Sequence, residues 1–442
     1  MKQRCLVIAD DLTGAADTGA QFVKNGFNTL LVSPRDADSI DFSEFSERDV
    51  LVIATDSRAL HPPEAFHLVS NLSRAIDRTL FPIIYKKIDS TLRGNIGQEV
   101  DAILYETGIP VCIAAPSYPE QHRTMVDGIM MVERKPIASS EFASALPVKT
   151  SDARNLLEKQ LVYGVGRIAL QHVRSGQDSL QKKIEAEQAK GHKIIIVDAV
   201  ERQDLANIAE TALKMSRTPL LVGSAGLAEE VAKRMSLSRE DGSQISMQRE
   251  SSREFKHIFI ISGSLSPVTH KQLERGEEKW GFPSFELTKP LLTTDENGWN
   301  DQKGALTGQI VSALERGHAV LKTCPEVIAT PNSPFPFNQH QIARRLADAV
   351  YAVMKAFRMH IQDFAMITIG GDTAMNVFSS LAFEGIEIEG ELIEGIMMGH
   401  LVGGLCDGLE VITKAGAFGG EDALCNILDL LSVSFSSGGS SN

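Results

Sequence analysis

The sequence contains few cysteines, and their placement argues against two kinds of stabilising site. The five cysteines lie far apart, form no CxxC pair and are odd in number (Cys5, Cys112, Cys324, Cys406 and Cys425). A disulfide framework or a structural zinc site needs paired or closely spaced cysteines. We therefore expect reduced thiols, which fit a cytoplasmic protein.

Long apolar runs and an excess of positive charge are also missing. No apolar stretch approaches the roughly 20 residues of a membrane-spanning helix, and the start MKQRCLVIADDLTGA has no signal-peptide pattern. The 44 basic residues are outnumbered by 57 acidic ones, which gives a formal net charge of −13. Because a negative field repels nucleic acid and anionic membranes, we expect neither as a partner. An anionic substrate must then be held by a local cluster of cations and N–H groups.

Several catalytic motifs are absent as well. The chain has no GxxxxGK[ST] loop, no protein-kinase signature set, no HExxH and no GxSxG. Its first apolar run ends in DDLTGA, where a dinucleotide-binding protein would carry GxGxxG. These absences exclude a Walker-type phosphate loop and argue against the usual zinc proteases and α/β-hydrolases.

What the sequence does contain is a repeated alternation of short apolar runs and helical stretches. Its 442 residues suggest about two to three domains. Runs such as CLVIAD (5–10) and HIFIISGS (257–264) are continuously apolar, which is typical of strands buried on both faces of a parallel sheet. We predict an α/β protein of two domains, each an open, mostly parallel sheet flanked by helices, with a ligand cleft between them.

A polar stretch rich in Ser, Arg and Glu sets the predicted boundary between the domains. The predicted organisation is an N-terminal domain at 1–235, a linker at 236–254, a C-terminal domain at 255–431 and a flexible tail at 432–442. Ligands of open α/β sheets bind beyond the carboxyl ends of the strands. The residues that follow each strand are therefore the candidate site residues.

Two strand ends in the first half carry charged residues. Asp10 and Asp11 end the first strand, and only one of them can cap the following helix. The pair is therefore a candidate general base, hydroxyl anchor or magnesium ligand. Arg58 follows another strand and suits bidentate capture of a carboxylate, although alone it is read more simply as a surface salt bridge.

The densest group of polar side chains follows the strand near 82–89. It combines cations, a carboxylate and hydroxyls (Lys87, Asp89, Ser90, Thr91 and Arg93). Asp, Ser and Thr can hydrogen-bond a polyol, while Lys and Arg can neutralise a carboxylate or a phosphoryl group. We predict a substrate site here. His122 and Arg123 are also plausible ligand contacts, and His122 and the turn at 223–226 fit a structural role equally well.

Three glycine-rich turns in the second half each lead into a predicted helix. Glycine lets the backbone approach a ligand, and free N–H groups at a helix start bind phosphate. Three such turns in one domain predict a nucleotide or polyphosphate site. The residues predicted to bind the nucleotide are Ser262, Ser264, Gly370, Gly371, Asp372, Thr373, Gly416 and Gly419.

Taken together, these motifs resemble those of the four-carbon acid sugar kinases. The matching segments span the chain: ADDLTGAAD (9–17), TDSR (55–58), KIDSTLRGN (87–95), SGS (262–264), GGDT (370–373) and KAGAFGG (414–420). The resemblance implies an N-terminal acid-sugar domain, a C-terminal ATP domain and phosphorylation of a terminal hydroxyl. Overall likeness favours D-threonate as the acid, with D-erythronate and 3-oxo-tetronate as alternatives.

Several points stay open at this level. Asp11 and Asp372 are both candidates for the catalytic base, and Mg²⁺ is inferred from ATP chemistry without an assigned ligand. A homodimer is compatible with the sequence but not demanded by it. Two other functional classes compete with the kinase: a nucleotide-cofactor oxidoreductase of hydroxy acids, and a non-catalytic sugar-acid sensor.

Overall fold

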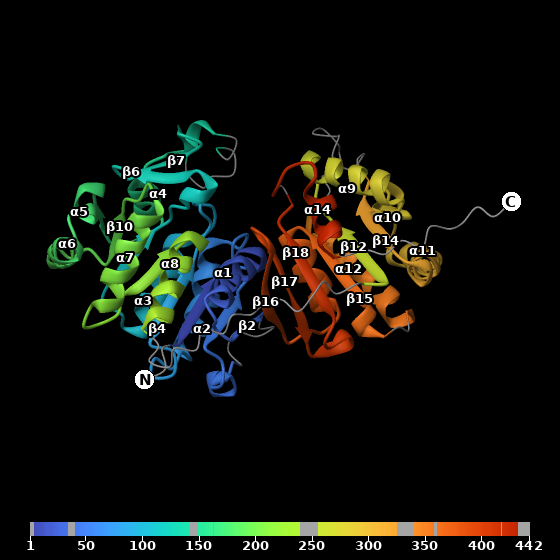
Figure 1. Ribbon diagram of the computed structural model, residues 1–442, viewed down its shortest axis with the longest axis horizontal. Coiled ribbons are helices and arrows are strands. Elements are labelled where there is room, and N and C mark those ends of the chain that lie inside the picture. Colours follow the sequence, from blue (N-terminus) through green and yellow to red (C-terminus); the bar gives the residue numbers. More distant parts are fainter. Residues whose placement is uncertain are drawn as a thin grey trace. The chain divides into compact units, whose positions relative to one another are not determined.

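The chain divides into two compact units, Met1–Ser246 and Met247–Asn442 (Figure 1, blue to green and yellow to red). The computed structural model describes residues 4–33, 40–140, 143, 149–161, 163–238, 255–324, 339–357, 360–416 and 418–431. The predicted tail and most of the predicted linker, from residue 239 onward, lie outside these residues. Among the described residues, no helix is long and apolar enough to cross a bilayer.

The N-terminal unit is built on a parallel sheet with the strand order β2-β3-β1-β4-β11-β5-β10-β9. The strands are β1 (Cys5–Ala9), β2 (Thr29–Val32), β3 (Val50–Ala54), β4 (Ile83–Lys87), β5 (Cys112–Ala115), β9 (Val165–Ile168), β10 (Ile194–Val197) and β11 (Leu220–Gly223). β1, β3 and β4 are buried along their whole length, as expected for strands covered on both faces.

The helices of this unit pack in two groups. In one group α1, α8, α7 and α6 lie successively side by side, and in the other α2 packs against α3. The helices are α1 (Leu12–Lys24), α2 (Pro62–Arg74), α3 (Ile96–Thr107), α4 (Ala153–Glu158), α5 (Leu170–Arg174), α6 (Gln177–Ala189), α7 (Arg202–Lys214) and α8 (Ala225–Leu237). A small antiparallel sheet holds β6 (Arg123–Val126), β7 (Ile129–Val132) and β8 (Lys135–Pro136).

The C-terminal unit has the strand order β13-β14-β12-β15-β18-β17-β16. Its strands are β12 (His257–Ser262), β13 (Ser284–Leu287), β14 (Ala319–Thr323), β15 (Phe364–Ile369), β16 (Gly385–Ile393), β17 (Ile396–Val402) and β18 (Glu410–Lys414). β17 is antiparallel to both of its neighbours, while β13, β14, β12, β15 and β18 are parallel. The sheet is therefore mostly parallel, as predicted.

Helices and a buried apolar cluster complete this unit. The helices are α9 (Pro267–Trp280), α10 (Lys289–Thr293), α11 (Glu296–Arg316), α12 (Gln339–Ala356), α13 (Gly371–Ser380) and α14 (Ala423–Leu430). Side chains of β12, β15 and β18, including Ile260, Ile367 and Ile412, pack with Leu424 and Leu428 of α14. The first four strands of each unit are arranged in the same spatial order, second-third-first-fourth. In the N-terminal unit this order is β2-β3-β1-β4, and in the C-terminal unit it is β13-β14-β12-β15.

The predicted α/β fold with mostly parallel sheets is confirmed, and the differences are local. β9 and β17 were not predicted, and neither were α4 and α5. α8 continues to Leu237, two residues into the predicted linker. The domain limits given above stay a prediction, although the division of the chain into two units is consistent with them.

Candidate active site

The predicted substrate-site residues of the N-terminal unit lie at the switch point of its sheet, where successive strands are added on opposite sides of β1. β1 pairs with β3 on one side and with β4 on the other, and all three run parallel. Their carboxyl ends therefore share one edge of the sheet. Asp10 follows β1, Arg58 follows β3 and Asp89 follows β4. Such a switch point is the usual ligand position of an open α/β sheet.

Arg58 joins the two adjacent aspartates. Its Nε and Nη2 atoms each lie 2.8 Å from an oxygen of Asp10, and its Nη1 and Nη2 atoms each lie 2.8 Å from an oxygen of Asp11. Asp11 also caps α1, where its Oδ1 accepts the N–H of Gly14 at 3.1 Å. The Asp11 side chain keeps 20% of its surface exposed, against 3% for Asp10. Asp11 is therefore the aspartate of the pair that a ligand can reach.

The electrostatics of this cluster favour charged side chains. Burial raises the pKa of Asp10, but the charges of Arg58 and Lys86 outweigh it, so that the pKa lies below its usual range. Burial likewise opposes the charge of Arg58, and the two aspartates hold the pKa of its guanidinium above its usual value. Asp10 and Arg58 form a fixed ionic unit near neutral pH.

The loop after β4 folds around Asp89. Its oxygens accept hydrogen bonds from Arg93 Nε and Nη2, both at 2.8 Å, from the Thr91 N–H at 3.1 Å and from the Thr91 hydroxyl. Although burial raises the pKa of Asp89, the Arg93 hydrogen bonds and the Arg58 charge lower it well below the usual range. Arg123 Nη1 donates to Ser90 Oγ, which brings a further cation to the loop.

Lys87 and Asp11 both approach the backbone of Gly14. The Lys87 Nζ atom donates to Ile88 O at 3.0 Å. A Cβ atom on Gly14 would lie 2.8 Å from that Nζ and 2.5 Å from Asp11 Oδ1. Both contacts are shorter than real Cβ atoms allow, so the Asp11 and Lys87 side chains can both approach this helix turn only because residue 14 has no side chain.

A buried ion pair between Lys86 and Glu99 stabilises the end of β4. Lys86 Nζ lies 2.5 Å from Glu99 Oε2, and both side chains are almost fully buried. Ser57 Oγ donates to the other oxygen of Glu99 at 2.8 Å. Strand alternation places Lys86 on the opposite face of β4 from Lys87 and Asp89, so Lys86 has a structural role.

The turn at 223–226 has a structural explanation, whereas the ligand contact of His122 stays a prediction. Ser224 caps α8 and donates to Ser117 O at 2.8 Å, while a Cβ atom on Gly223 would collide with Ala115 O and Tyr85 Oη, each at 2.8 Å. The turn at 223–226 therefore serves close packing. His122 is an exposed residue in the left-handed region, with φ of 55°.

In the C-terminal unit, the structure brings the three glycine turns together. They follow β12, β15 and β18, which are adjacent and parallel. The N–H of Gly263 donates to Thr373 Oγ1 at 3.2 Å, which links the first turn to the second. Thr269 Oγ1 lies 2.9 Å from Ser264 Oγ and donates to Gly416 O at 2.5 Å, which links the first turn to the third.

The predicted nucleotide-binding residues all lie on these turns. Gly370 is the N-cap of α13 with φ of 107°, a conformation that favours glycine, and Gly371, Asp372 and Thr373 form the first turn of the helix. Ser262 Oγ is buried at the end of β12 and has no hydrogen-bond partner among the described residues. Gln272 Nε2 donates to the carbonyls of Phe418, Gly419 and Gly420 and so holds the third turn.

Asp372 is the carboxylate of this site that fits Mg²⁺. It is exposed in the first turn of α13. Mg²⁺ prefers oxygen ligands and is usually held by one or two carboxylates together with substrate phosphates and water. Asp372 offers one such carboxylate beside the glycine turns.

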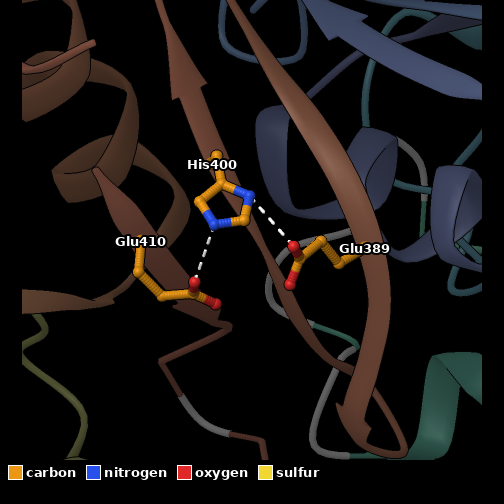
Figure 2. Close-up of side chains that lie close together, drawn as sticks. All are labelled: Glu389, His400 and Glu410. Atoms are coloured by element: carbon orange, nitrogen blue, oxygen red, sulfur yellow. Dashed lines mark ion pairs between the residues drawn. The ribbon is translucent and has the colours of Figure 1, made fainter. Parts of the chain in front are cut away.

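A second cluster fits Mg²⁺ poorly. Figure 2 shows the imidazole of His400 between two carboxylates: Nδ1 lies 3.1 Å from Glu389 Oε1, and Nε2 lies 2.9 Å from Glu410 Oε2. Hydrogen bonds that the imidazole donates to both carboxylates raise the pKa of His400 to about 10. A protonated imidazole has no lone pair for a metal. Glu389 lies at an irregularity of β16, so the cluster is an ionic bridge across β16, β17 and β18.

Comparison with protein families decides which proteins this chain is related to. Residues 5–231 match a sugar-binding N-terminal domain, and residues 259–424 match a nucleotide-binding C-terminal domain. The chain is 31% identical over 435 residues to D-threonate kinase of Salmonella typhimurium, covering 96% of this chain and 97% of the relative. This chain belongs to the four-carbon acid sugar kinase family.

Other members differ in the acid that they phosphorylate. D-erythronate kinase of Heliobacterium modesticaldum is 28% identical, with 96% of both chains covered. 3-oxo-tetronate kinase of Haemophilus influenzae is 27% identical, covering 94% of this chain and 97% of the relative. The predicted resemblance and the predicted class of enzyme, a phosphotransferase of the sugar-acid kinase type, are confirmed.

Solved structures agree with the fold. A Haemophilus influenzae protein superposes with a TM-score of 0.71 at 23% identity, covering 96% of this chain and 100% of that protein. A Salmonella typhimurium protein described as a tRNA synthase superposes with a TM-score of 0.76 at 20% identity, covering 96% and 98%. At these identities the likeness concerns the fold alone.

Proposed function

We propose that the protein transfers the γ-phosphoryl group of ATP to the terminal hydroxyl of a four-carbon sugar acid, with D-threonate as the favoured acid. One observation carries the proposal. The N-terminal unit gathers aspartates and cations at one strand edge, while the C-terminal unit gathers three glycine turns at another. The first edge suits a carboxylate-bearing polyol and the second suits phosphates.

Lys87 and Arg123 are the cations that we assign to the carboxylate of the acid. Arg58 was expected to take this role, but its N–H groups already donate to Asp10 and Asp11. We therefore propose that Arg58 orders the two aspartates. Asp89, Ser90 and Thr91, with Arg93 fixing Asp89, hold the hydroxyls of the acid.

We assign the catalytic base to Asp11. The terminal hydroxyl oxygen attacks the γ-phosphorus while the bond from phosphorus to the β–γ bridging oxygen breaks and ADP leaves. The hydroxyl proton passes to the exposed part of the Asp11 carboxylate, which Arg58 and the Gly14 N–H hold in place. The glycine-turn N–H groups orient the phosphates, and positioning of this kind supplies much of the catalysis of phosphoryl transfer.

Asp372 is the residue that we assign to Mg²⁺. When bound, Mg²⁺ neutralises phosphate charge and helps align the γ-phosphoryl group. Asp372 remains the second candidate for the base, and its placement in the glycine turn favours the metal role.

The test is an ADP-release assay with D-threonate, D-erythronate and 3-oxo-tetronate, with the products identified by ³¹P NMR. We expect turnover with at least one acid, and D-threonate is the favoured one. ATP turnover with none of the three acids would contradict the proposal. A homodimer and a cytoplasmic location remain predictions, and light scattering would test the first.

An Asp11→Asn variant tests the base. Its turnover should fall about 10²- to 10⁴-fold, the usual contribution of general-base catalysis. Asp152→Asn is the matched control, because Asp152 caps α4 by accepting the Asn155 N–H at 3.1 Å, the same distance as in the Asp11 cap. Asparagine caps helices as well as aspartate does, so the control should keep full turnover.

A further inference from the structure

A buried lysine stands among the glycine turns, and the mechanism above does not use it. Lys414 ends β18 and is 1% exposed. Its Nζ atom donates to Ala415 O at 3.0 Å and to Gly416 O at 3.1 Å. Its own carbonyl accepts the N–H of Gly370 at 2.8 Å. Lys414 therefore touches the second turn through its backbone and the third turn through its ammonium group.

The charge of Lys414 has no partner of opposite sign among the described residues. In the part of the chain that the structure describes, no carboxylate forms an ion pair with it. Burial lowers the pKa of its ammonium group to about 8. A buried, unpaired charge is costly, and perturbed groups of this kind are frequent where a ligand supplies the opposite charge.

A second buried lysine of the same sheet gives the contrast. Lys322 is also buried, on β14, but its Nζ atom lies 2.7 Å from Glu277 Oε1 and 3.7 Å from Glu286 Oε1. Two further cations, Lys271 and Arg275 of α9, pair with Glu421. These charges are neutralised within the protein, whereas the charge of Lys414 is not.

The strands on either side of Lys414 place apolar residues beside it. Its partners on the adjacent strands are Ile369 of β15 and Ile396 of β17. Thr269 of α9 contacts Gly416, and the first turn of α13 contributes one charged residue, Asp372. An ammonium group has three N–H donors, and two of them are used here. The third has no acceptor among the residues that the structure describes.

We infer that Lys414 is the phosphate-binding cation of the C-terminal unit, whose third N–H donates to a phosphate oxygen of the nucleotide. The inference rests on the proposed kinase function, because it takes the three glycine turns as the nucleotide site. It also answers a problem posed by the sequence, since a chain with a net charge of −13 repels ATP and needs a local cation to hold it.

Calorimetric titration of the full chain tests this inference. ADP, pyrophosphate and adenosine are titrated into the wild type, Lys414→Met and the control Lys322→Met. A hydrogen bond to a charged group is worth about 1.5–3 kcal/mol, so Lys414→Met should bind ADP and pyrophosphate about 10- to 150-fold more weakly. Adenosine carries no phosphate, and its affinity should not change. Lys322→Met should bind all three ligands as the wild type does.

Proton uptake gives a second readout that needs no variant. A phosphate anion raises the pKa of an adjacent ammonium group. From a starting pKa of about 8, the wild type at pH 8.5 should take up as much as about three-quarters of a proton on binding ADP, and much less at pH 6.5. Titrations in two buffers of different ionisation enthalpy measure this uptake. Lys414→Met should lose it.

The outcomes separate this inference from the proposed function. ADP affinity within twofold of wild type in Lys414→Met, or no proton uptake by the wild type at pH 8.5, would overturn the role of Lys414 and leave the kinase function standing. Lys414-dependent ADP binding without turnover of any sugar acid would support Lys414 and overturn the kinase. A wild type that binds neither ADP nor pyrophosphate would overturn both.

Discussion

Replacing Gly14 with alanine should remove activity while leaving stability almost unchanged. The new Cβ atom would lie 2.5 Å from Asp11 Oδ1 and 2.8 Å from Lys87 Nζ, so both side chains must move. Alanine is favoured over glycine in a helix by about 1 kcal/mol, and loss of the Asp11 cap costs about 1 kcal/mol. These two effects nearly cancel, so the free energy of unfolding should change by less than about 1 kcal/mol. Turnover should fall about 10²-fold or more, because the proposed base is displaced.

Two assays and one control make this prediction decisive. Turnover is followed by ADP release, and stability by chemical denaturation. Gly304→Ala is the control, because Gly304 lies inside α11 and a Cβ atom there meets nothing within 4 Å. The control should keep full turnover and gain about 0.5–1 kcal/mol. A Gly14→Ala variant with turnover within threefold of wild type would refute the proposed roles of Asp11 and Lys87 at this helix turn.

Three further predictions follow. Lys86→Met leaves the buried Glu99 carboxylate without its ion pair and should reduce the free energy of unfolding by about 3–5 kcal/mol, while Lys86→Met with Glu99→Leu should recover most of it; equal stability of the two variants would count against this. Gly416→Ala places a Cβ atom 2.7 Å from Ser264 Oγ and should weaken ADP binding about tenfold, the value of one hydrogen bond, with no effect on the affinity for the acid; Gly308→Ala in α11 is its control. The raised pKa of His400, about 10, means that its ion pairs stabilise the fold fully below about pH 6.5 and lose this effect as the pH rises through 10. The difference in free energy of unfolding between wild type and His400→Gln should therefore shrink from pH 7 to 10, and a constant difference would show that the bridge is not ionic.

Strand cores and strand-end residues were predictable, because both follow from local sequence. A continuous apolar run such as Val50–Ala54 identifies a strand covered on both faces, and the residues after it fall at the ligand edge. β17 was missed because it lacks such a local signal. Its sequence, Ile396–Val402, contains Gly399 and His400, and its antiparallel pairing with β16 and β18 is not visible in the sequence. β9 includes Gly166 and the exposed Arg167, so it reads as a loop.

Side-chain partners were less predictable than positions. Arg58 was expected to hold the acid, but it bonds both aspartates, because strand pairing brings the end of β3 beside the end of β1. No role was predicted for Lys414, which belongs to the motif KAGAFGG (414–420). Its proposed role follows from burial without a carboxylate partner among the described residues, which depends on what packs around it in space. The one available sequence signal was a lysine ending an otherwise apolar strand before a glycine turn.

The central claim is that each unit holds its own substrate, the acid at the carboxyl ends of β1, β3 and β4 and the nucleotide at the glycine turns after β12, β15 and β18. The most direct test is a crystal structure of the full chain with D-threonate and a non-hydrolysable ATP analogue. We predict the carboxylate of the acid beside Lys87 and phosphate oxygens on the N–H groups of residues 370–373. Phosphates bound at Asp10 and Arg58, or both molecules within one unit, would contradict the claim.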